Sequence, residues 1–107
     1  MARVLSIAAD LMLGSKVTET LGAAGHEVVS SPSIAESSWE DVDLIVADLD
    51  VESPEALVGL GTPVLGYYSH VDVETKREAE VAGIDLAVPR SRMARELPAL
   101  VERLLDV

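Results

Sequence analysis

Apolar residues along the chain alternate between short continuous runs and stretches with helical spacing. The continuous runs are predicted strands, at residues 3–9, 26–30, 42–47, 62–68 and 84–88. The stretches between and after them are predicted helices, at residues 11–25, 32–39, 53–61, 71–83 and 91–105, the second of them short at most. Strands that alternate with helices predict a parallel sheet with helices on both faces.

Several helix ends are marked by glycine or proline. Gly25 and Gly83 follow helical stretches, where a glycine in the left-handed conformation commonly ends a helix. Pro98 falls inside the last helical stretch, and a proline in a helix interior removes one hydrogen bond. We therefore expect the regular part of that helix to begin near Arg95 or Glu96, so that Pro98 lies in its first turn.

The most apolar predicted strand ends on acidic residues. The segment "DLIVADLD" (43–50) runs through four apolar residues and then reaches Asp48 and Asp50. In open α/β sheets the functional groups gather at the carboxyl ends of the strands, which makes these two acids candidates for a site. The alternative for Asp48 alone is an aspartate that caps the turn after the strand.

Composition and charge exclude several classes of protein. The chain has 107 residues, which indicates a single domain over residues 1–107, and no apolar run approaches the ~20 residues of a membrane span. It has no cysteine, so disulfides and Cys-based metal sites are excluded. A net charge of −11 argues against binding nucleic acid or anionic membranes. With no secretory signal recognised at its start, the protein is expected to be cytoplasmic.

Three segments together resemble the receiver domain of bacterial response regulators. They are residues 3–29, 43–50 and 62–91, and the lengths of their strands and helices match that family over nearly the whole chain. The resemblance implies the flavodoxin-like (CheY-like) fold, a five-stranded parallel sheet with strand order 2-1-3-4-5 and helices on both faces. It also implies that the carboxyl ends of the strands form the functional site.

The resemblance places Asp48 at the position of the phosphorylated aspartate. Asp50 falls where a backbone carbonyl of the family helps to hold Mg²⁺, a metal that prefers oxygen ligands. The two positions of the metal-binding acidic pair hold Ala8 and Ala9, with Asp10 one residue beyond them. Asp10 can join the site only if the loop after the first strand shifts by one residue. The candidate metal ligands are therefore Asp10, Asp48 and Asp50.

The remaining positions of the family's site are also changed. Tyr68 stands at the position of a small hydroxyl residue, with Ser69 directly after it. Arg90 stands at the position of the site's lysine, and Ala87 at the position of an aromatic residue on the fifth strand. We expect Arg90 to contact Asp48, directly or through one water, and Tyr68 to narrow the access to Asp48.

Two further expectations concern neighbouring residues. Tyr67 and Tyr68 are adjacent in a predicted strand and should point to opposite faces of the sheet. Arg90, Arg92 and Arg95 form a basic group at the start of the last helix. Either they face the carboxylates at the strand ends or an anionic partner, or they are solvated arginines beside a nearby glutamate.

These departures favour a stand-alone receiver-like module that signals by binding another protein and is not phosphorylated. Such a module is not an enzyme and needs no cofactor, Mg²⁺ being the one metal its acids could hold. Its expected partner is a protein such as a kinase or a signalling output protein, and the chain itself is expected to be a monomer or a weak homodimer. Two alternatives stay open: a phosphorelay response regulator that accepts phosphate at Asp48, and a small flavodoxin-like ligand-binding domain.

Overall fold

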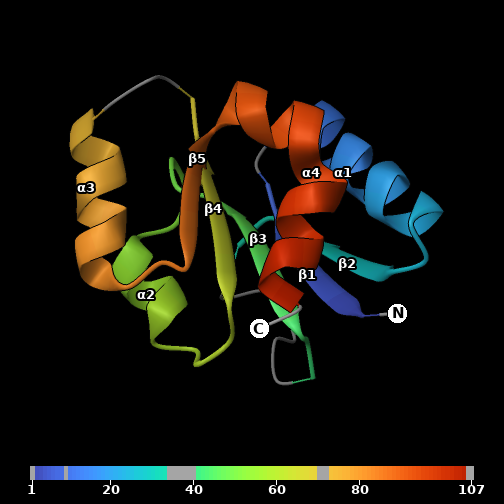
Figure 1. The fold of residues 1–107 in the computed structure, drawn as a ribbon, viewed down its shortest axis with the longest axis horizontal. Helices are drawn as coiled ribbons and strands as arrows, with labels where there is room; N and C mark the ends of the chain where they lie inside the picture. The colour runs from blue at the N-terminus through green and yellow to red at the C-terminus, as the bar shows by residue number, and fades with distance from the viewer. Residues whose placement is uncertain (1, 9, 34–40, 70–72, 106–107) are drawn as a thin grey trace.

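A computed structural model describes residues 2–8, 10–33, 41–69 and 73–105. Its strands are β1 (Arg3–Ile7), β2 (Glu27–Ser31), β3 (Leu44–Asp48), β4 (Val64–Tyr68) and β5 (Leu86–Pro89). Its helices are α1 (Leu11–Ala23), α2 (Pro54–Val58), α3 (Val73–Ala82) and α4 (Arg90–Leu105). The strands form one parallel sheet in the order β2-β1-β3-β4-β5 (Figure 1), which confirms the predicted fold.

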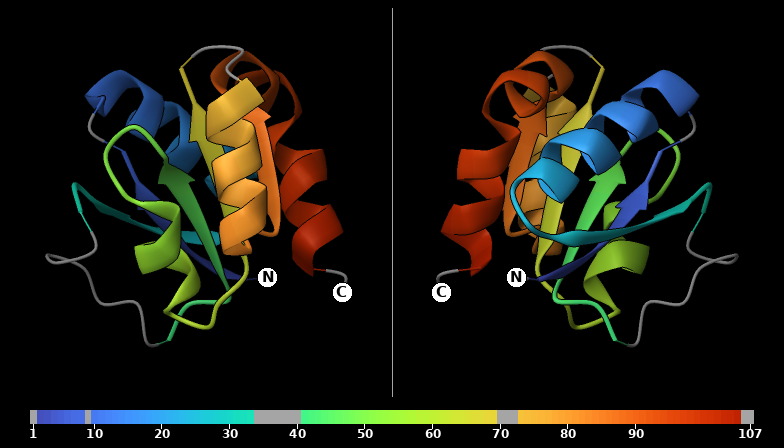
Figure 2. Two further views of the ribbon diagram at one scale, coloured as in Figure 1. Left: turned by 90° about the vertical axis from the view of Figure 1, so that its left-hand side faces the viewer. Right: turned by 90° about the vertical axis from the view of Figure 1, so that its right-hand side faces the viewer.

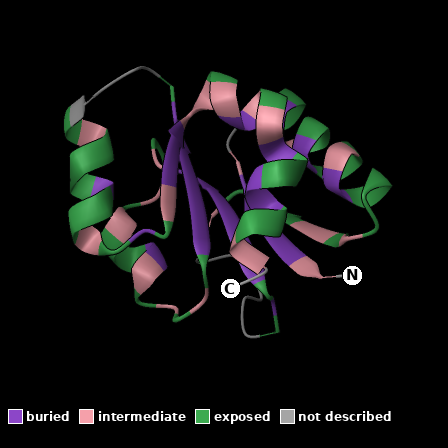
Figure 3. Cartoon of the chain, in the orientation of Figure 1, coloured by how far each residue is buried: buried purple, intermediate pink, exposed green. Residues whose placement is uncertain are grey.

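Of the described helices, α1 and α4 cover one face of the sheet and α2 and α3 cover the other (Figure 2). Buried side chains of α1 and α4 share one apolar cluster with the sheet, and those of α2 and α3 share a second cluster on the other face. The central strands are buried on both sides (Figure 3), which explains their continuous apolar runs. The result is a three-layer α/β/α domain whose strands all end at the same edge.

Two aspartates hold the opposite edge of the sheet together. Each directly precedes a strand: the Asp43 carboxylate accepts a hydrogen bond from the backbone N–H of Arg3 at 2.9 Å, and the Asp85 carboxylate accepts one from Val64 at 2.8 Å. Both bonds satisfy a backbone donor at the start of the neighbouring strand, where the sheet itself supplies no partner. These acids therefore serve the fold and lie away from the carboxyl ends of the strands.

The predicted glycine ends are confirmed, whereas the predicted start of the last helix is wrong. Gly25 follows the C-cap Ala24 of α1 with a φ angle of 94°, and Gly83 directly follows α3 with a φ angle of 104°. Helix α4, however, begins at Arg90 and runs continuously past Pro98. The Pro98 side chain faces solvent, and the apolar face of α4 is fully buried through Met93, Leu97, Leu100 and Val101. Burial of that face on both sides of the proline keeps the helix regular despite the lost hydrogen bond.

Tyr67 and Tyr68 point to opposite faces, as predicted. Tyr67 belongs to the cluster beneath α1 and α4, and Tyr68 belongs to the cluster beneath α2 and α3. The helix predicted at residues 32–39 falls almost entirely outside the described residues. No helix in the described part of the chain is long and apolar enough to span a bilayer.

Candidate functional site

The strand-end site comprises Asp10, Asp48, Asp50, Ser69 and Arg90. Asp48 closes the central strand β3 and is 7% exposed, which makes it the one buried carboxylate among the described residues. Its Oδ1 accepts a hydrogen bond of 2.8 Å from the backbone N–H of Asp50. This contact is the turn-capping bond that an aspartate at a strand end can form. Asp48 therefore caps the turn that follows β3, as the alternative interpretation of this residue expected.

Tyr67 is the aromatic neighbour of Asp48. The two residues are register partners in the β3–β4 pair, so their side chains lie on the same face of the sheet. The Tyr67 hydroxyl donates to the carbonyl oxygen of Ile7 at 3.5 Å, which ties β4 to the carboxyl end of β1. Burial raises the pKa of Tyr67 well above its usual value, and the negative charge of Asp48 raises this pKa further. Tyr67 thus remains protonated and continues to donate.

Asp10 joins the site from the start of α1. Its Oδ1 accepts hydrogen bonds from the backbone N–H groups of Met12 at 2.9 Å and Leu13 at 3.3 Å, so Asp10 is the N-cap of the helix. Its Oδ2 is ion-paired with the guanidinium of Arg90. The backbone hydrogen bonds of Leu13 and Met12, followed by the bond from Arg90, hold the pKa of Asp10 below its usual value.

Asp50 and Ser69 connect the loops that follow β3 and β4. The Ser69 hydroxyl donates to Oδ2 of Asp50, and both side chains are exposed. Ser69 was included in the predicted site because it follows Tyr68, and the structure does bring it to the carboxylates. The four predicted site residues Asp10, Asp50, Ser69 and Arg90 therefore form two pairs around the end of β3.

Two predicted contacts differ in the structure. Arg90 forms its ion pair with Asp10, and the described residues include no direct ion pair between Arg90 and Asp48. The predicted direct contact is therefore wrong, although a contact through one water stays a prediction. Tyr68 joins the apolar cluster on the other face of the sheet, so Tyr67 takes the place beside Asp48 that was expected for Tyr68. The parallel register decides this, because it sets Asp48 opposite Tyr67.

The basic group at the start of α4 divides into two parts. Arg90 faces the strand-end carboxylates, as one of the two interpretations expected. Arg92 pairs with Glu96 at 3.3 Å, and Arg95 lies 3.9 Å from the same glutamate. Both of these contacts are on the surface, where such pairs contribute little to stability. Of these three arginines, Arg90 alone is paired with an acid of the strand-end site.

The charge environment of Asp48 makes its ionised form costly. Burial raises the pKa of Asp48 above its usual value, the backbone hydrogen bond from Asp50 lowers it in part, and the nearby charge of Asp50 raises it again. The charge of Arg90, whose guanidinium is paired with Asp10, lowers this pKa by less than burial raises it. An acid whose folded pKa is raised destabilises the fold above that pKa, and the cost disappears as the pH falls below its unfolded value.

We expect Asp48→Asn to stabilise the protein at neutral pH by about 1 kcal/mol, because the amide avoids the cost of a buried charge and keeps an oxygen for the Asp50 N–H. The gain in stability should shrink as the pH is lowered through the folded pKa of Asp48 toward the ordinary aspartate pKa of 3.8. Denaturant unfolding at a series of pH values measures it. Asp10→Asn is the control: the pKa of Asp10 is lowered, so this variant should be less stable at neutral pH. If Asp48→Asn raised the free energy of unfolding by the same amount at every pH, the raised pKa of Asp48 would be contradicted.

The acids do not converge into a metal-binding group. Among the described residues, no three His, Cys, Asp or Glu side chains are placed to hold one metal ion. The three acidic side chains have protein partners: Asp10 pairs with Arg90, Asp48 accepts from the Asp50 N–H, and Asp50 accepts from Ser69.

Sequence reasoning missed two features near this site. It placed Tyr68 beside Asp48, because β3 and β4 are buried on both faces and their apolar pattern alone does not give the register that pairs Asp48 with Tyr67. It also gave no role to Ser6, Ser30 and Thr18, which line a pocket between α1 and the strands β1 and β2. The only signal was the appearance of polar residues at positions of β1 and β2 that face a helix.

Comparison with known proteins identifies the fold. No protein-family model and no curated protein matches the sequence. Solved structures do match: a response regulator receiver domain protein from Clostridium thermocellum superposes with a TM-score of 0.84 at 16% identity, covering 99% of this chain and 95% of that one. The chemotaxis protein CheY4 of Vibrio cholerae gives 0.79 at 20% identity, with 98% and 99% covered.

A third match is longer than this chain. NtrX from Brucella abortus superposes with a TM-score of 0.83 at 20% identity over 98% of this chain, which spans only 26% of the NtrX chain. At these identities the likeness concerns the fold. The chain therefore has the CheY-like fold of response regulator receiver domains, with a strand-end site whose acids are paired with protein groups.

Proposed function

We propose that this protein is a receiver-like signalling module that acts by binding another protein and is not phosphorylated at Asp48. It is not an enzyme in this proposal, and it needs neither Mg²⁺ nor another cofactor. The partner is a protein of a signalling pathway, such as a kinase or an output protein.

The ion pair between Asp10 and Arg90 carries the proposal. A carboxylate that accepts phosphate needs a metal ion and a free cation to neutralise the charge that develops on the phosphoryl group. Asp10 is the acid available on the β1 side, and its two oxygens are occupied by the start of α1 and by Arg90. Arg90 is the cation available on the α4 side, and its guanidinium is already paired with Asp10. Phosphorylation would have to break this pair first.

A thermal melt with Mg²⁺ and beryllofluoride, a mimic of the phosphoryl group, tests the proposal. A ligand at ~100 times its dissociation constant adds about 2.7 kcal/mol of stability, which is roughly 10–20 °C in melting temperature for a domain of this size. We expect millimolar Mg²⁺ with beryllofluoride to move the melting temperature by less than about 2 °C.

Asp48→Asn is the control for that experiment, since it removes the carboxylate that stands at the phosphoacceptor position. A shift of about 10 °C in the parent protein that is absent from Asp48→Asn would establish a working acyl-phosphate site. That result would replace the proposal by the alternative, a phosphorelay regulator that accepts phosphate at Asp48.

The surface of α3 and α4 is the expected partner face, because the resemblance to receivers implies interaction there. Helix α3 presents charged residues to solvent, and all four charged side chains from Lys76 to Glu80 are exposed. Self-association through such a face should be weak and should weaken further with salt, because exposed charges are screened. Sedimentation at about 20 mM and 500 mM salt measures this. A tight dimer that salt leaves unchanged would contradict it.

A further inference from the structure

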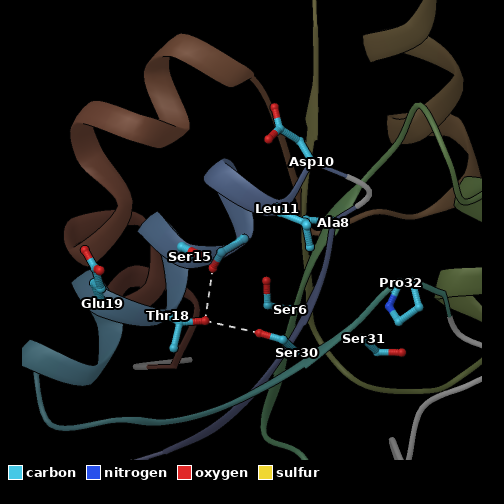
Figure 4. A pocket seen from close by; sticks show the side chains of 11 residues that line it. Ser6, Ala8, Asp10, Leu11, Ser15, Thr18, Glu19, Ser30, Ser31 and Pro32 are labelled. Carbon is cyan, nitrogen blue, oxygen red and sulfur yellow. Dashed lines mark hydrogen bonds between the residues drawn. The ribbon is translucent and has the colours of Figure 1, made fainter.

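A pocket of about 540 Å³ lies between the first half of α1 and the carboxyl halves of β1 and β2. This volume falls within the range of small-molecule sites. The pocket is separate from Asp48 and meets the strand-end site only at its rim, through Asp10. Figure 4 shows Ser6 and Ser30 on the strands facing Thr18 on the helix, with Asp10 at one end of the space and Pro32 at the other.

Small residues create this space. Val4 and Val28 are register partners near the amino ends of β1 and β2 and pack against the core beneath α1. Two residues further along the same face, the partners are Ser6 and Ser30. The helix contributes Gly14 above them, where an added Cβ would still stand 3.7 Å from the Cβ of Ala8. The apolar filling therefore stops halfway along the strands.

The hydroxyl of Ser6 is the unusual group in the pocket. Ser6 is 1% exposed, and its Oγ has no hydrogen-bond partner within the described part of the chain. Its neighbours are partnered: the Thr18 hydroxyl donates to the carbonyl of Gly14 at 3.0 Å and lies 3.1 Å from the Ser30 hydroxyl. A buried hydroxyl without a partner costs free energy, and a ligand that bonds to it recovers that cost.

The charges around the pocket select the ligand. The described lining residues include no arginine, lysine or histidine, and they do include Asp10 and Glu19, so the site does not suit phosphates or carboxylates. Asp10 is occupied by α1 and Arg90 and does not serve to anchor a cation. Leu11, 85% exposed, and Pro32 offer apolar surface at the mouth. We infer that this pocket binds a small uncharged molecule with an amide or hydroxyl head and a short apolar body.

In this arrangement the head group bonds to Ser6 at the bottom of the pocket, and the apolar body covers Leu11 and Pro32. Burying the exposed part of Leu11 adds to the affinity, because apolar surface is removed from water. Binding here goes beyond the proposed protein-interaction role. It requires neither phosphorylation of Asp48 nor a protein partner, so it stands or falls by itself.

Three probes of equal length test the inference by NMR titration of the ¹⁵N-labelled protein: pentanamide, pentanoate and pentylammonium. We expect pentanamide to shift the amide signals of Gly14, Ser30 and Ser31 saturably, with a dissociation constant on the order of 1–10 mM for a molecule this small. Pentanoate and pentylammonium should bind at least about tenfold more weakly, since either charged head group must lose its hydration to reach Ser6, where the neighbouring side chains of Thr18 and Ser30 are neutral hydroxyls. An equal affinity for either charged probe, or no saturable shift with pentanamide, overturns the inference.

Ser6→Ala tests the role of the hydroxyl. The variant should bind pentanamide about tenfold more weakly, as expected for one lost hydrogen bond. Its melting temperature should be unchanged or higher, because the variant no longer buries an unpartnered polar group. A lower melting temperature would show that the hydroxyl is satisfied within the fold and would overturn the inference.

Ser15→Phe tests the location independently of Ser6. Ser15 is an exposed residue of α1 that lines the pocket, so an aromatic ring there should fill the space and abolish the pentanamide shifts without unfolding the protein. Ala56→Phe is the matched control, because Ala56 is an exposed residue of α2 on the other side of the sheet. Retained binding in Ser15→Phe, or lost binding in Ala56→Phe, would count against this pocket.

Discussion

Leu97→Ala is expected to lower the free energy of unfolding by about 2–5 kcal/mol, the usual cost of truncating a fully buried leucine. Leu97 is 1% exposed and lies in the cluster that joins α1, α4 and the sheet. Its truncation leaves a cavity within that cluster. In a domain of this size the melting temperature should fall on the order of 10–25 °C, which differential scanning calorimetry measures.

Leu11→Ala is the matched control for Leu97→Ala. The chemical change is the same and both residues are helical, but Leu11 is 85% exposed. Because it buries little surface, its truncation should change the free energy of unfolding by less than about 0.5 kcal/mol. If the two variants lost similar stability, the packing of α4 on the sheet described above would be wrong.

Pro98→Ala is expected to raise the free energy of unfolding by about 1–3 kcal/mol. A proline in a helix interior costs about 3 kcal/mol, because it removes a backbone donor and its ring crowds the carbonyl four residues earlier. Part of the gain is lost again, since alanine leaves the unfolded chain more flexible by about 0.4–1 kcal/mol. Pro98 is exposed within α4, so the substitution disturbs no core contact.

Thermal unfolding should show the gain of Pro98→Ala as a rise of roughly 5–15 °C in melting temperature. Glu102→Ala, at an exposed position of the same helix, should change it little and serves as the control. The prediction fails if Pro98→Ala melts at or below the temperature of the parent protein, which would place Pro98 at a break between two helices.

The architecture of this protein can be predicted from its amino-acid sequence alone. Apolar periodicity located the strands and helices, since a strand buried on both sides must be apolar throughout whereas a helix is apolar on one face. The parallel sheet followed from the alternation, and the strand order followed from the resemblance to receivers. The same information placed Asp48 at the carboxyl end of the central strand, where the structure has it.

Local sequence could not determine the pairings at the strand ends. Arg90 was expected to contact Asp48 directly or through one water. Its ion pair is with Asp10, because Asp10 caps α1 and points its second oxygen toward the start of α4. The two residues are 80 positions apart in the chain, so only the packing of α1 beside α4 brings them together. Side-chain partners across such a distance depend on the final approach of two helices, which no local pattern encodes.

The position of the pocket under α1 also depends on the tertiary structure. Ser6 and Ser30 are two ordinary residues in the sequence, and only the β1–β2 register makes them neighbours beneath α1. The continuity of α4 through Pro98 also depends on tertiary packing. Burial of the apolar residues on both sides of Pro98 outweighs the tendency of proline to end a helix. Sequence patterns indicate which face of each helix or strand is buried. The distance at which two such faces pack depends on side chains from several elements at once. This packing distance determines the ion pair of Arg90 and the presence of the pocket under α1.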